Sequence, residues 1–238
     1  MTDIAGATVL VTGGSRGIGK AIVEELYRRG AKKVYATARD ASTVRHPDAV
    51  ALPLEVSDPA SVAAVAAAAQ DVTILINNAG AAVSASFLDS PVEDVRREFE
   101  TNFYGPLLTA RAFAPIIERN GGGHLLNMHS ALSWVGIAGS YSASKAALWS
   151  QTNSLRLDLL PRGIQVTGLH VGYVDTDLVA EVDAPKTAPA EVARQALDGI
   201  EANAFEVLVD DVSRGVKAGL SGDLAALYPQ LAAARQAA

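Results

Sequence analysis

Short apolar runs alternate with longer amphipathic or alanine-rich segments along most of this chain. Short runs rich in Val, Ile and Leu and bounded by turn residues predict buried strands, and the longer segments predict helices. The predicted strands are residues 7–12, 31–38, 50–56, 73–77, 124–129, 164–171 and 205–209. The predicted helices are residues 20–29, 59–70, 91–120, 141–160 and 189–202, and the alanine-rich tail is expected to be helical or frayed. This alternation predicts an α/β fold with a doubly wound parallel sheet between two helical layers.

The composition agrees with a single domain of this kind, covering residues 1–238. Apolar residues make up 49% of the chain and aromatic residues only 5%, which indicates a core of Ala, Val, Leu and Ile. A parallel sheet covered by helices on both faces requires such a core. No internal repeat, low-complexity linker or shift in composition marks a domain boundary.

The charge and the lack of cysteine exclude several classes of function. A formal net charge of −6 argues against a nucleic-acid partner, because phosphate contacts need a basic face. The absence of cysteine removes disulfides, thiolate metal sites and thiol nucleophiles. The amino terminus lacks the basic start of a signal peptide, and the longest apolar run, residues 62–69, is too short to span a bilayer. We therefore expect a soluble, cytoplasmic protein without a membrane partner.

A glycine-rich turn at residues 12–19 joins the first predicted strand to the first predicted helix. Its sequence is Thr-Gly-Gly-Ser-Arg-Gly-Ile-Gly. Glycines at such a place let backbone N–H groups approach a phosphate at a helix amino terminus, and Gly19 would allow close packing of helix against strand. A nucleotide site is therefore expected here, with a plain strand-to-helix turn as the alternative.

The residues after the second predicted strand favour NADP over NAD. At the position where an acid would bind the ribose 2′-hydroxyl of NAD, the chain has Ala38 and then Arg39. Arg39 and Arg16 of the glycine turn could both bind a 2′-phosphate, although either could also be a solvated surface charge. Asp40 could turn inward or pair with Arg39.

Tyr141 and Lys145 are the candidates for acid/base chemistry. If residues 141–145 open a helix, the two side chains lie one turn apart on the same face, and the ammonium would lower the pKa of the phenol. Ser130 lies upstream at the end of a predicted strand, where its hydroxyl could polarise a carbonyl, and Ser133 is the alternative for that role. An ordinary amphipathic helix would also explain a Tyr and a Lys at this spacing.

Polar residues mark two further places. Residues 77–80, Asn-Asn-Ala-Gly, follow the fourth predicted strand at the edge where open α/β sheets bind ligands. Asn102 interrupts the long predicted helix at residues 101–106, and an asparagine there usually bonds a backbone carbonyl or marks a local distortion. The histidines do not predict a metal site: His129 should point away from Ser130 by strand alternation, and His124 and His170 lie on separate strands.

In combination these motifs resemble the short-chain dehydrogenase/reductase family over nearly the whole chain. The resemblance implies a Rossmann fold, NAD(P) as cofactor, and oxidation or reduction of a small-molecule alcohol or carbonyl substrate. It implies catalytic roles for Asn102, Ser130, Tyr141 and Lys145. The residues that it implies for cofactor binding are Gly13, Ser15, Arg16, Gly17, Ile18, Gly19, Arg39, Glu55, Val56, Asn78, Ala79, Gly80, Tyr141, Lys145, Val174 and Thr176. With Arg16 and Arg39, NADP(H) is preferred and NAD(H) is the second choice.

The chain departs from the family pattern in the substrate region. The loop from Ser130 to Tyr141 is shorter than usual, and so is the segment 176–189 that often covers the substrate. Trp134, Tyr173 and Leu178 are candidate pocket walls beside Ser133, with helix–sheet packing as the alternative.

Two other functions are compatible with the same motifs, and the apolar helices predict an oligomer. The rivals are a non-catalytic NADP(H)-binding sensor or scaffold of the same fold, and a lyase or epimerase that retains its cofactor. Leu148, Trp149, Leu155 and Leu159 give the second long helix more than one apolar side. A helix of this kind must bury its outer face, so we expect a homodimer or homotetramer through the helices around Asn102 and Tyr141.

Overall fold

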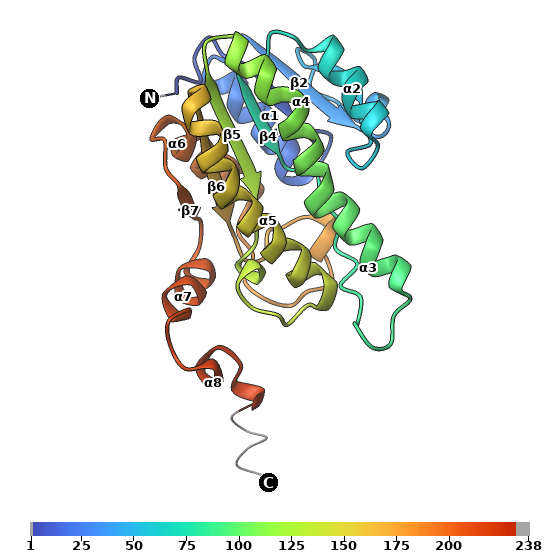
Figure 1. The fold of residues 1–238 in the computed structure, drawn as a ribbon, viewed down its shortest axis with the longest axis vertical. Helices are drawn as coiled ribbons and strands as arrows, with labels where there is room; N and C mark the ends of the chain where they lie inside the picture. Colours follow the sequence, from blue (N-terminus) through green and yellow to red (C-terminus); the bar gives the residue numbers. More distant parts are fainter. Residues whose placement is uncertain (1, 232–238) are drawn as a thin grey trace.

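A seven-stranded parallel sheet with helices on both faces forms the body of the protein. The computed structural model describes residues 2–231, apart from the side chain of Leu178. The strand order is β3-β2-β1-β4-β5-β6-β7, and every pairing is parallel. The strands are β1 (Thr8–Val11), β2 (Lys33–Ala38), β3 (Val50–Pro53), β4 (Ile74–Asn77), β5 (Gly123–Met128), β6 (Ile164–His170) and β7 (Glu206–Leu208). The predicted doubly wound α/β sheet is confirmed (Figure 1).

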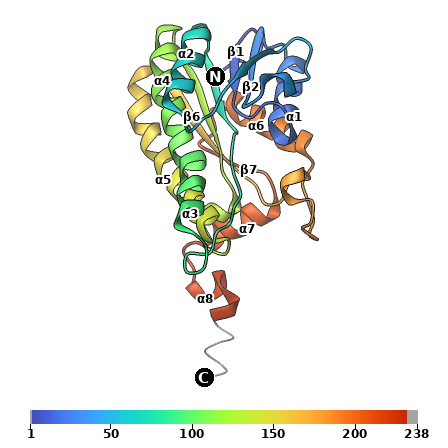
Figure 2. The ribbon, with the colours of Figure 1, turned by 90° about the vertical axis from the view of Figure 1, so that its right-hand side faces the viewer.

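Two helical layers enclose the sheet, as Figure 2 shows from the side. The helices are α1 (Gly17–Arg28), α2 (Pro59–Ala68), α3 (Val92–Phe99), α4 (Gly105–Arg119), α5 (Gly139–Leu159), α6 (Pro189–Glu201), α7 (Asp211–Gly219) and α8 (Leu224–Leu227). α1 and α6 cover one face, and α2, α4 and α5 cover the other. Among residues 2–231, no helix combines the length and apolar character needed to cross a membrane.

Alternation along the strands divides the apolar core between these two faces. In β1, Val9 and Val11 pack with α1 and α6, whereas Leu10 between them packs with the helices of the opposite layer. All three side chains are fully buried. Successive side chains of a strand point to opposite faces, so a strand covered on both sides needs an unbroken apolar run. This explains why the central strands β1 and β4 consist largely of Val, Leu and Ile.

Some element bounds differ from the predicted ones. α1 begins at Gly17, inside the glycine turn, and α5 begins at Gly139, before Tyr141. The predicted helix 91–120 consists of α3, a π-helical turn at Glu100–Tyr104 and α4, so the interruption expected near Asn102 is a change of helical hydrogen bonding. The tail contains α7 and α8, which lie at the end of the molecule toward which the strands point (Figure 1). Residues 232–238 of the predicted tail lie outside the described part.

Candidate active site

The glycine turn is closely packed on the end of β4. A Cβ atom on Gly19 would lie 2.1 Å from the Gly13 carbonyl oxygen and 2.5 Å from Asn78 Nδ2, so no larger residue fits there without a shift. Asn78 Nδ2 donates hydrogen bonds to the carbonyls of Thr12 (2.9 Å) and Gly13 (3.2 Å). Thr12 Oγ1 in turn accepts hydrogen bonds from the backbone N–H groups of Asn78 and Ala79, both at 3.0 Å. The predicted turn and the Asn-Asn-Ala-Gly segment therefore form one structure.

The amino terminus of α1 is suited to bind an anion. Arg16, its N-cap residue, has extended backbone angles, and its side chain makes no capping hydrogen bond. The first-turn N–H groups and the helix dipole therefore favour a negative group at this end. Thr176 borders the same turn, because its Cγ2 atom would lie 3.2 Å from a Cβ on Gly17, whose φ is +52°. The glycine turn and the first-turn N–H groups of α1 together form a cradle that fits a nucleotide pyrophosphate.

Arg16 and Arg39 stand exposed near this cradle. Asp40, which could have turned inward, instead caps a short 3₁₀ turn: its Oδ1 accepts hydrogen bonds from Ser42 N (2.9 Å) and Ser42 Oγ (2.7 Å). These bonds hold the pKa of Asp40 below its usual range. The Arg16 guanidinium lies 3.7 Å from the Asp177 carboxylate, and both side chains are largely exposed. The carboxylate of Asp40 is thus held in a local turn, and Arg39 at the end of β2 is exposed.

The other predicted cofactor residues lie along the same edge, with different contacts. Glu55 Oε1 accepts a hydrogen bond from Ser57 Oγ at 2.8 Å, so its carboxylate closes a local turn. Val56 is buried, and a Cβ on Gly105 would lie 2.9 Å from its Cγ2 atom. Val174 is buried and forms an isolated parallel bridge with Thr187, which fixes the loop that leads to Thr176.

Ser130 and Ser133, the two candidates for the hydroxyl that polarises the carbonyl, lie in one short turn after β5. Ser130 is buried at the end of β5, and its Oγ accepts a hydrogen bond from Leu132 N at 3.1 Å. Ser133 Oγ accepts one from Ser130 N at 3.3 Å, so the pair forms a reciprocal cap of the 3₁₀ turn Ala131–Ser133. The Ser130 side chain also interacts with Tyr141 and opposes the rise in the pKa of that phenol. The shortened loop therefore keeps Ser130 within reach of Tyr141.

Tyr141 and Lys145 lie on adjacent turns of α5, as predicted. Lys145 Nζ lies 5.8 Å from the centre of the Tyr141 ring and donates a 2.8 Å hydrogen bond to the Met128 carbonyl. Burial raises the pKa of Tyr141 to about 12, and the nearby Glu98 carboxylate acts in the same direction. Burial lowers the pKa of Lys145 to about 8, and Glu98 opposes this shift. The expected lowering of the Tyr141 pKa is not seen in this structure, where burial has the largest effect and Lys145 is not among the groups that shift that pKa.

Asn102 connects three segments at the centre of the site. Its side chain is fully buried in the π-helical turn. Its Oδ1 accepts from Ala81 N at 2.9 Å, and its Nδ2 donates to Ala81 O at 2.9 Å and to Ser144 Oγ at 3.0 Å. A Cβ on Gly80 would lie 3.3 Å from Asn102 Oδ1 and 3.8 Å from Lys145 Nζ. Asn102, Gly80 and Lys145 therefore meet at the carboxyl edge of the sheet, beside the glycine turn.

Comparison with known proteins agrees with this geometry. The sequence profile of the family described as short chain dehydrogenase matches residues 7–187. The chain belongs to the short-chain dehydrogenase/reductase family. This membership confirms the resemblance seen in the motifs. The chain shares the family's Rossmann fold, nucleotide binding and oxidoreductase activity.

Individual members of the family match most of the chain. A "Ketoacyl reductase HetN" from Nostoc sp. is 30% identical over 88% of this chain and 80% of the relative. An "NADPH-dependent 1-acyldihydroxyacetone phosphate reductase" from Schizosaccharomyces pombe is 38% identical over 71% of this chain, which spans only 60% of that relative. The crystal structure of a short chain dehydrogenase from Burkholderia cenocepacia in complex with NADP superimposes with a TM-score of 0.91 at 35% identity, over 96% of this chain and 98% of that one.

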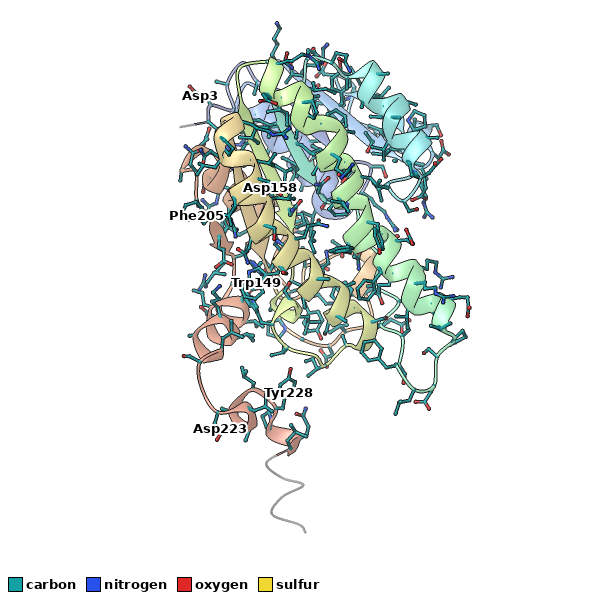
Figure 3. The ribbon with its side chains drawn as sticks, viewed as in Figure 1. Asp3, Trp149, Asp158, Phe205, Asp223 and Tyr228 are labelled. Atoms are coloured by element: carbon teal, nitrogen blue, oxygen red, sulfur yellow. The ribbon has the colours of Figure 1, made fainter. Side chains whose placement is uncertain are left out.

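Trp134 belongs to a buried aromatic stack. Its ring stacks on His170 with centroids 4.0 Å apart, and Lys217 Nζ lies 4.9 Å from the ring centre. Trp149, on the side of α5 nearest β7 and α7 (Figure 3), meets Trp134 edge-on and donates a 2.9 Å hydrogen bond to Glu206. This arrangement corresponds to the packing alternative and not to an open pocket wall. Tyr173 is 42% exposed, and the side chain of Leu178 lies outside the described part.

The buried histidines have structural roles. His129 stacks on His170 with centroids 4.6 Å apart, and its Nε2 lies 3.1 Å from Thr152 Oγ1. His124 Nε2 lies 2.8 Å from Thr167 Oγ1, and burial lowers the pKa of His124 to about 4. Within residues 2–231, no group of three or more His, Cys, Asp or Glu side chains could hold a metal ion.

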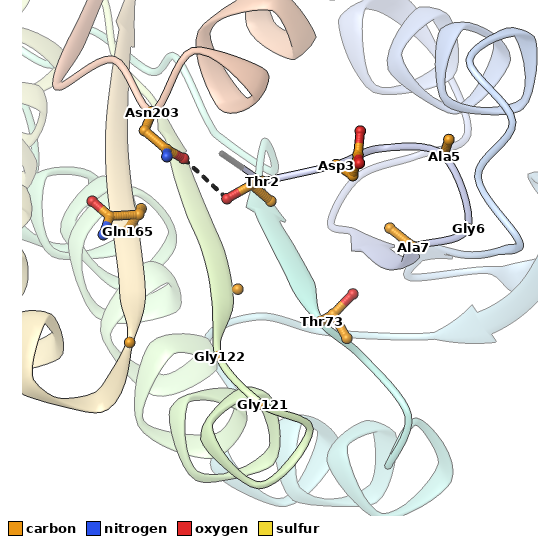
Figure 4. Close-up of a pocket in the computed structure, with 12 residues that line it drawn as sticks. Thr2, Asp3, Ala5, Gly6, Ala7, Thr73, Gly121, Gly122, Gln165 and Asn203 are labelled. Carbon is orange, nitrogen blue, oxygen red and sulfur yellow. Dashed lines mark hydrogen bonds between the residues drawn. The ribbon is translucent and has the colours of Figure 1, made fainter.

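A shallow hollow at the opposite edge of the sheet is separate from this site. It lies at the amino ends of the strands, between the first residues of the chain and the glycines at 121–123 (Figure 4). Thr2 Oγ1 donates a 3.0 Å hydrogen bond to Asn203 Oδ1 across one side of it. Ligands bind open α/β sheets at the carboxyl ends of the strands, so this hollow is not the nucleotide site.

Proposed function

We propose that the protein is an NADP(H)-dependent oxidoreductase that transfers a hydride between the nicotinamide and a carbonyl or secondary alcohol, with Tyr141 as the acid/base. The observation that carries this proposal is the arrangement of Ser130, Tyr141, Lys145 and Asn102 at the sheet edge beside the glycine turn. The cofactor, when bound, supplies the hydride that forms the new C–H bond in reduction, or accepts it in oxidation.

The residues of the chain supply the proton and stabilise the charge. In reduction, the C=O π electrons move to oxygen as hydride reaches carbon, and Ser130 donates a hydrogen bond to that oxygen. Tyr141 then gives its proton to the oxygen, which completes the alcohol and leaves a phenolate. The Lys145 ammonium stabilises that phenolate, and a water held by the backbone near Asn102 returns the proton. Oxidation runs through the same steps in reverse.

Binding roles follow the same geometry. The first-turn amides around Ile18 would bind the pyrophosphate, Val174 and Thr176 the nicotinamide amide, and Lys145 the nicotinamide ribose. Arg16 and Arg39 would bind the 2′-phosphate, which the fork geometry of arginine suits. The NADP complex and the NADPH-dependent relative support this choice.

The two arginines provide a test of cofactor choice. Replacing Arg39 with Leu should weaken NADPH binding about 10-fold or more, because a charge-assisted hydrogen bond contributes about 1.5–3 kcal/mol. NADH binding should change little, since it lacks the 2′-phosphate. Fluorescence titration of both cofactors measures the two affinities, with the exposed Arg96→Leu as the control for loss of a surface arginine. Equal losses for NADPH and NADH would contradict the assignment.

A spectrophotometric screen tests the reaction itself. Oxidation of NADPH and of NADH is followed with a panel of aliphatic and aromatic ketones and aldehydes, beside fluorescence measurements of cofactor binding. Turnover with at least one carbonyl supports the proposal. Tight NADPH binding without turnover on any carbonyl would favour the sensor or scaffold.

We also propose that the enzyme acts as a homodimer or homotetramer through the helices around Asn102 and Tyr141. Leu148 and Leu159, which were expected on an outer apolar face of this helix, are buried within the chain itself. Leu157 at the end of α5 and the adjacent Leu160 are instead 75% and 61% exposed, and they give the outer surface its apolar character. Light scattering should give two or four times the 24.7 kDa chain mass, and Leu157→Glu should reduce it. A monomeric wild type would contradict the proposal.

A further inference from the structure

Glu98, near the end of α3, is a fully buried carboxylate that the mechanism above does not use. Its Oε1 accepts a 2.7 Å hydrogen bond from Val83 N, and its Oε2 accepts one from Ser84 N at 3.2 Å. Ser140 Oγ donates a short hydrogen bond to Oε2. A charge is rarely buried unless it is paired or fully hydrogen-bonded, so these bonds account for its stability in the interior.

These contacts join segment 81–85, which follows the Asn-Asn-Ala-Gly motif, to the first turn of α5. Ser140 Oγ also accepts a 2.9 Å hydrogen bond from Ala85 N, and Ser140 N donates to Ala85 O at 3.1 Å. Ser84 has φ +55°, which a non-glycine residue rarely adopts. A Cβ on Gly139 would lie 2.2 Å from Ala85 O. The segment is therefore fitted tightly against α5.

A second pair of residues repeats this arrangement one helical turn further along. Glu98 and Asn102 lie four residues apart, and so do their partners Ser140 and Ser144 on α5. Asn102 binds the backbone N–H and C=O groups of Ala81. Glu98 binds the backbone N–H groups of Val83 and Ser84 in the same segment. The residues that follow the two serines are Tyr141 and Lys145. Each of these two sets of hydrogen bonds therefore includes a serine directly before one member of the acid/base pair.

We propose that Glu98 is a positioning residue of the active site: its carboxylate fixes segment 81–85 to the amino-terminal turn of α5 and so sets the placement and electrostatic surroundings of Tyr141 and Lys145. This inference rests on the proposed function of that pair. The carboxylate is the negative charge that favours the ammonium of Lys145 and disfavours ionisation of Tyr141. Lys145 also faces His129, whose pKa burial holds well below its usual value and which is therefore neutral. Removing the charge of Glu98 lowers the pKa of both Lys145 and Tyr141.

The first experiment measures the Lys145 pKa in the full-length protein, without substrate. Lysine labelled with ¹³C at Cε is titrated by NMR, with Lys145→Met to assign the signal. The expected pKa of Lys145 in the wild type is about 8, and Glu98→Gln, which keeps the shape and removes the charge, should give a lower one. The exposed Glu100→Gln on the same helical segment is the control and leaves the titration unchanged. An unaltered Lys145 pKa in Glu98→Gln overturns the electrostatic part of the proposal.

The second experiment measures turnover with the carbonyl from the panel that reacts fastest. Glu98→Ala lowers kcat on the order of 100-fold, the loss expected when reacting groups are displaced by about 1 Å, while the NADPH dissociation constant changes less than threefold. Ser140→Ala lowers kcat alone but adds little to Glu98→Ala, because both remove the same contact. A kcat within twofold of wild type in both Glu98 variants overturns the positioning role, even if the unfolding temperature falls.

The two proposals fail in distinguishable ways. A protein that oxidises NADPH normally after Tyr141→Phe refutes the proposed function. A protein that loses activity after Tyr141→Phe but keeps wild-type kcat and Lys145 titration after Glu98→Gln refutes only the inference about Glu98.

Discussion

Tyr141→Phe should lower kcat by about 10²–10⁴-fold, the range that positioned acid/base groups contribute. The substitution removes the only proton that the proposed mechanism delivers to the carbonyl oxygen, and it leaves the ring and its packing in place. NADPH affinity should stay within a few-fold. The measurement is steady-state turnover beside fluorescence titration, and Tyr104→Phe is the control, since that side chain is 44% exposed. Near-normal turnover in Tyr141→Phe would rule out its role as the acid.

The rates of carbonyl reduction and alcohol oxidation should depend differently on pH, because Tyr141 gives a proton in the first reaction and takes one in the second. Reduction needs the protonated phenol, and burial raises the pKa of Tyr141 to about 12, so the proton donor is present throughout the neutral range. Oxidation needs the phenolate, so its rate should rise as the pH increases toward that pKa. The rise with pH should disappear in Tyr141→Phe. An oxidation rate independent of pH in the wild type would contradict the assignment of Tyr141 as the base.

Gly19→Ala should have the second large effect, on both cofactor binding and stability. The added methyl group would lie 2.1 Å from the Gly13 carbonyl oxygen and 2.5 Å from Asn78 Nδ2. Overpacking of this kind costs typically about 1–3 kcal/mol, and the overlap with backbone places this site at the upper end. The displaced turn should bind NADPH at least about 10-fold more weakly, since 1.4 kcal/mol corresponds to a factor of ten.

Gly215→Ala on α7 is the matched control for this prediction. A Cβ at Gly215 meets nothing within 4 Å, so the substitution should stabilise the protein by up to about 1 kcal/mol through helix propensity. Thermal unfolding and NADPH titration of both variants provide the comparison. A Gly19→Ala protein with wild-type stability and affinity would mean that the turn can relax without loss.

The order of strands and helices was predictable because burial on both faces imposes a local pattern. The strand that contains Leu10 is apolar from Val9 to Val11, and the glycine turn that follows it marks the start of α1. The grouping of Ser130, Tyr141 and Lys145 was also predictable, because parallel strands bring their carboxyl ends to one edge. These inferences depend on short segments of sequence and on general rules of sheet topology.

The features that the sequence did not reveal depend on contacts between distant segments. Glu98 reads as one more charged residue in an amphipathic helix, and its position four residues before Asn102 was the only signal of its burial. The raised pKa of Tyr141 depends on how much water the surrounding chain removes, which spacing along α5 does not determine. The burial of Trp134 likewise depends on Lys217, which belongs to a helix that the pattern predicted only as an undefined tail.

The hydrogen bonds between Thr12 and Asn78 also have a consequence for biosynthesis. They join residues 66 positions apart in the chain, so a ribosome must release β4 before the first glycine turn can be held in shape. The contact between Asn102 and Ser144 must wait longer still, until the first turns of α5 have emerged. The amino-terminal glycine turn, which we propose to bind the cofactor, is therefore translated first but completed late, and a nascent chain without β4 should not retain NADPH.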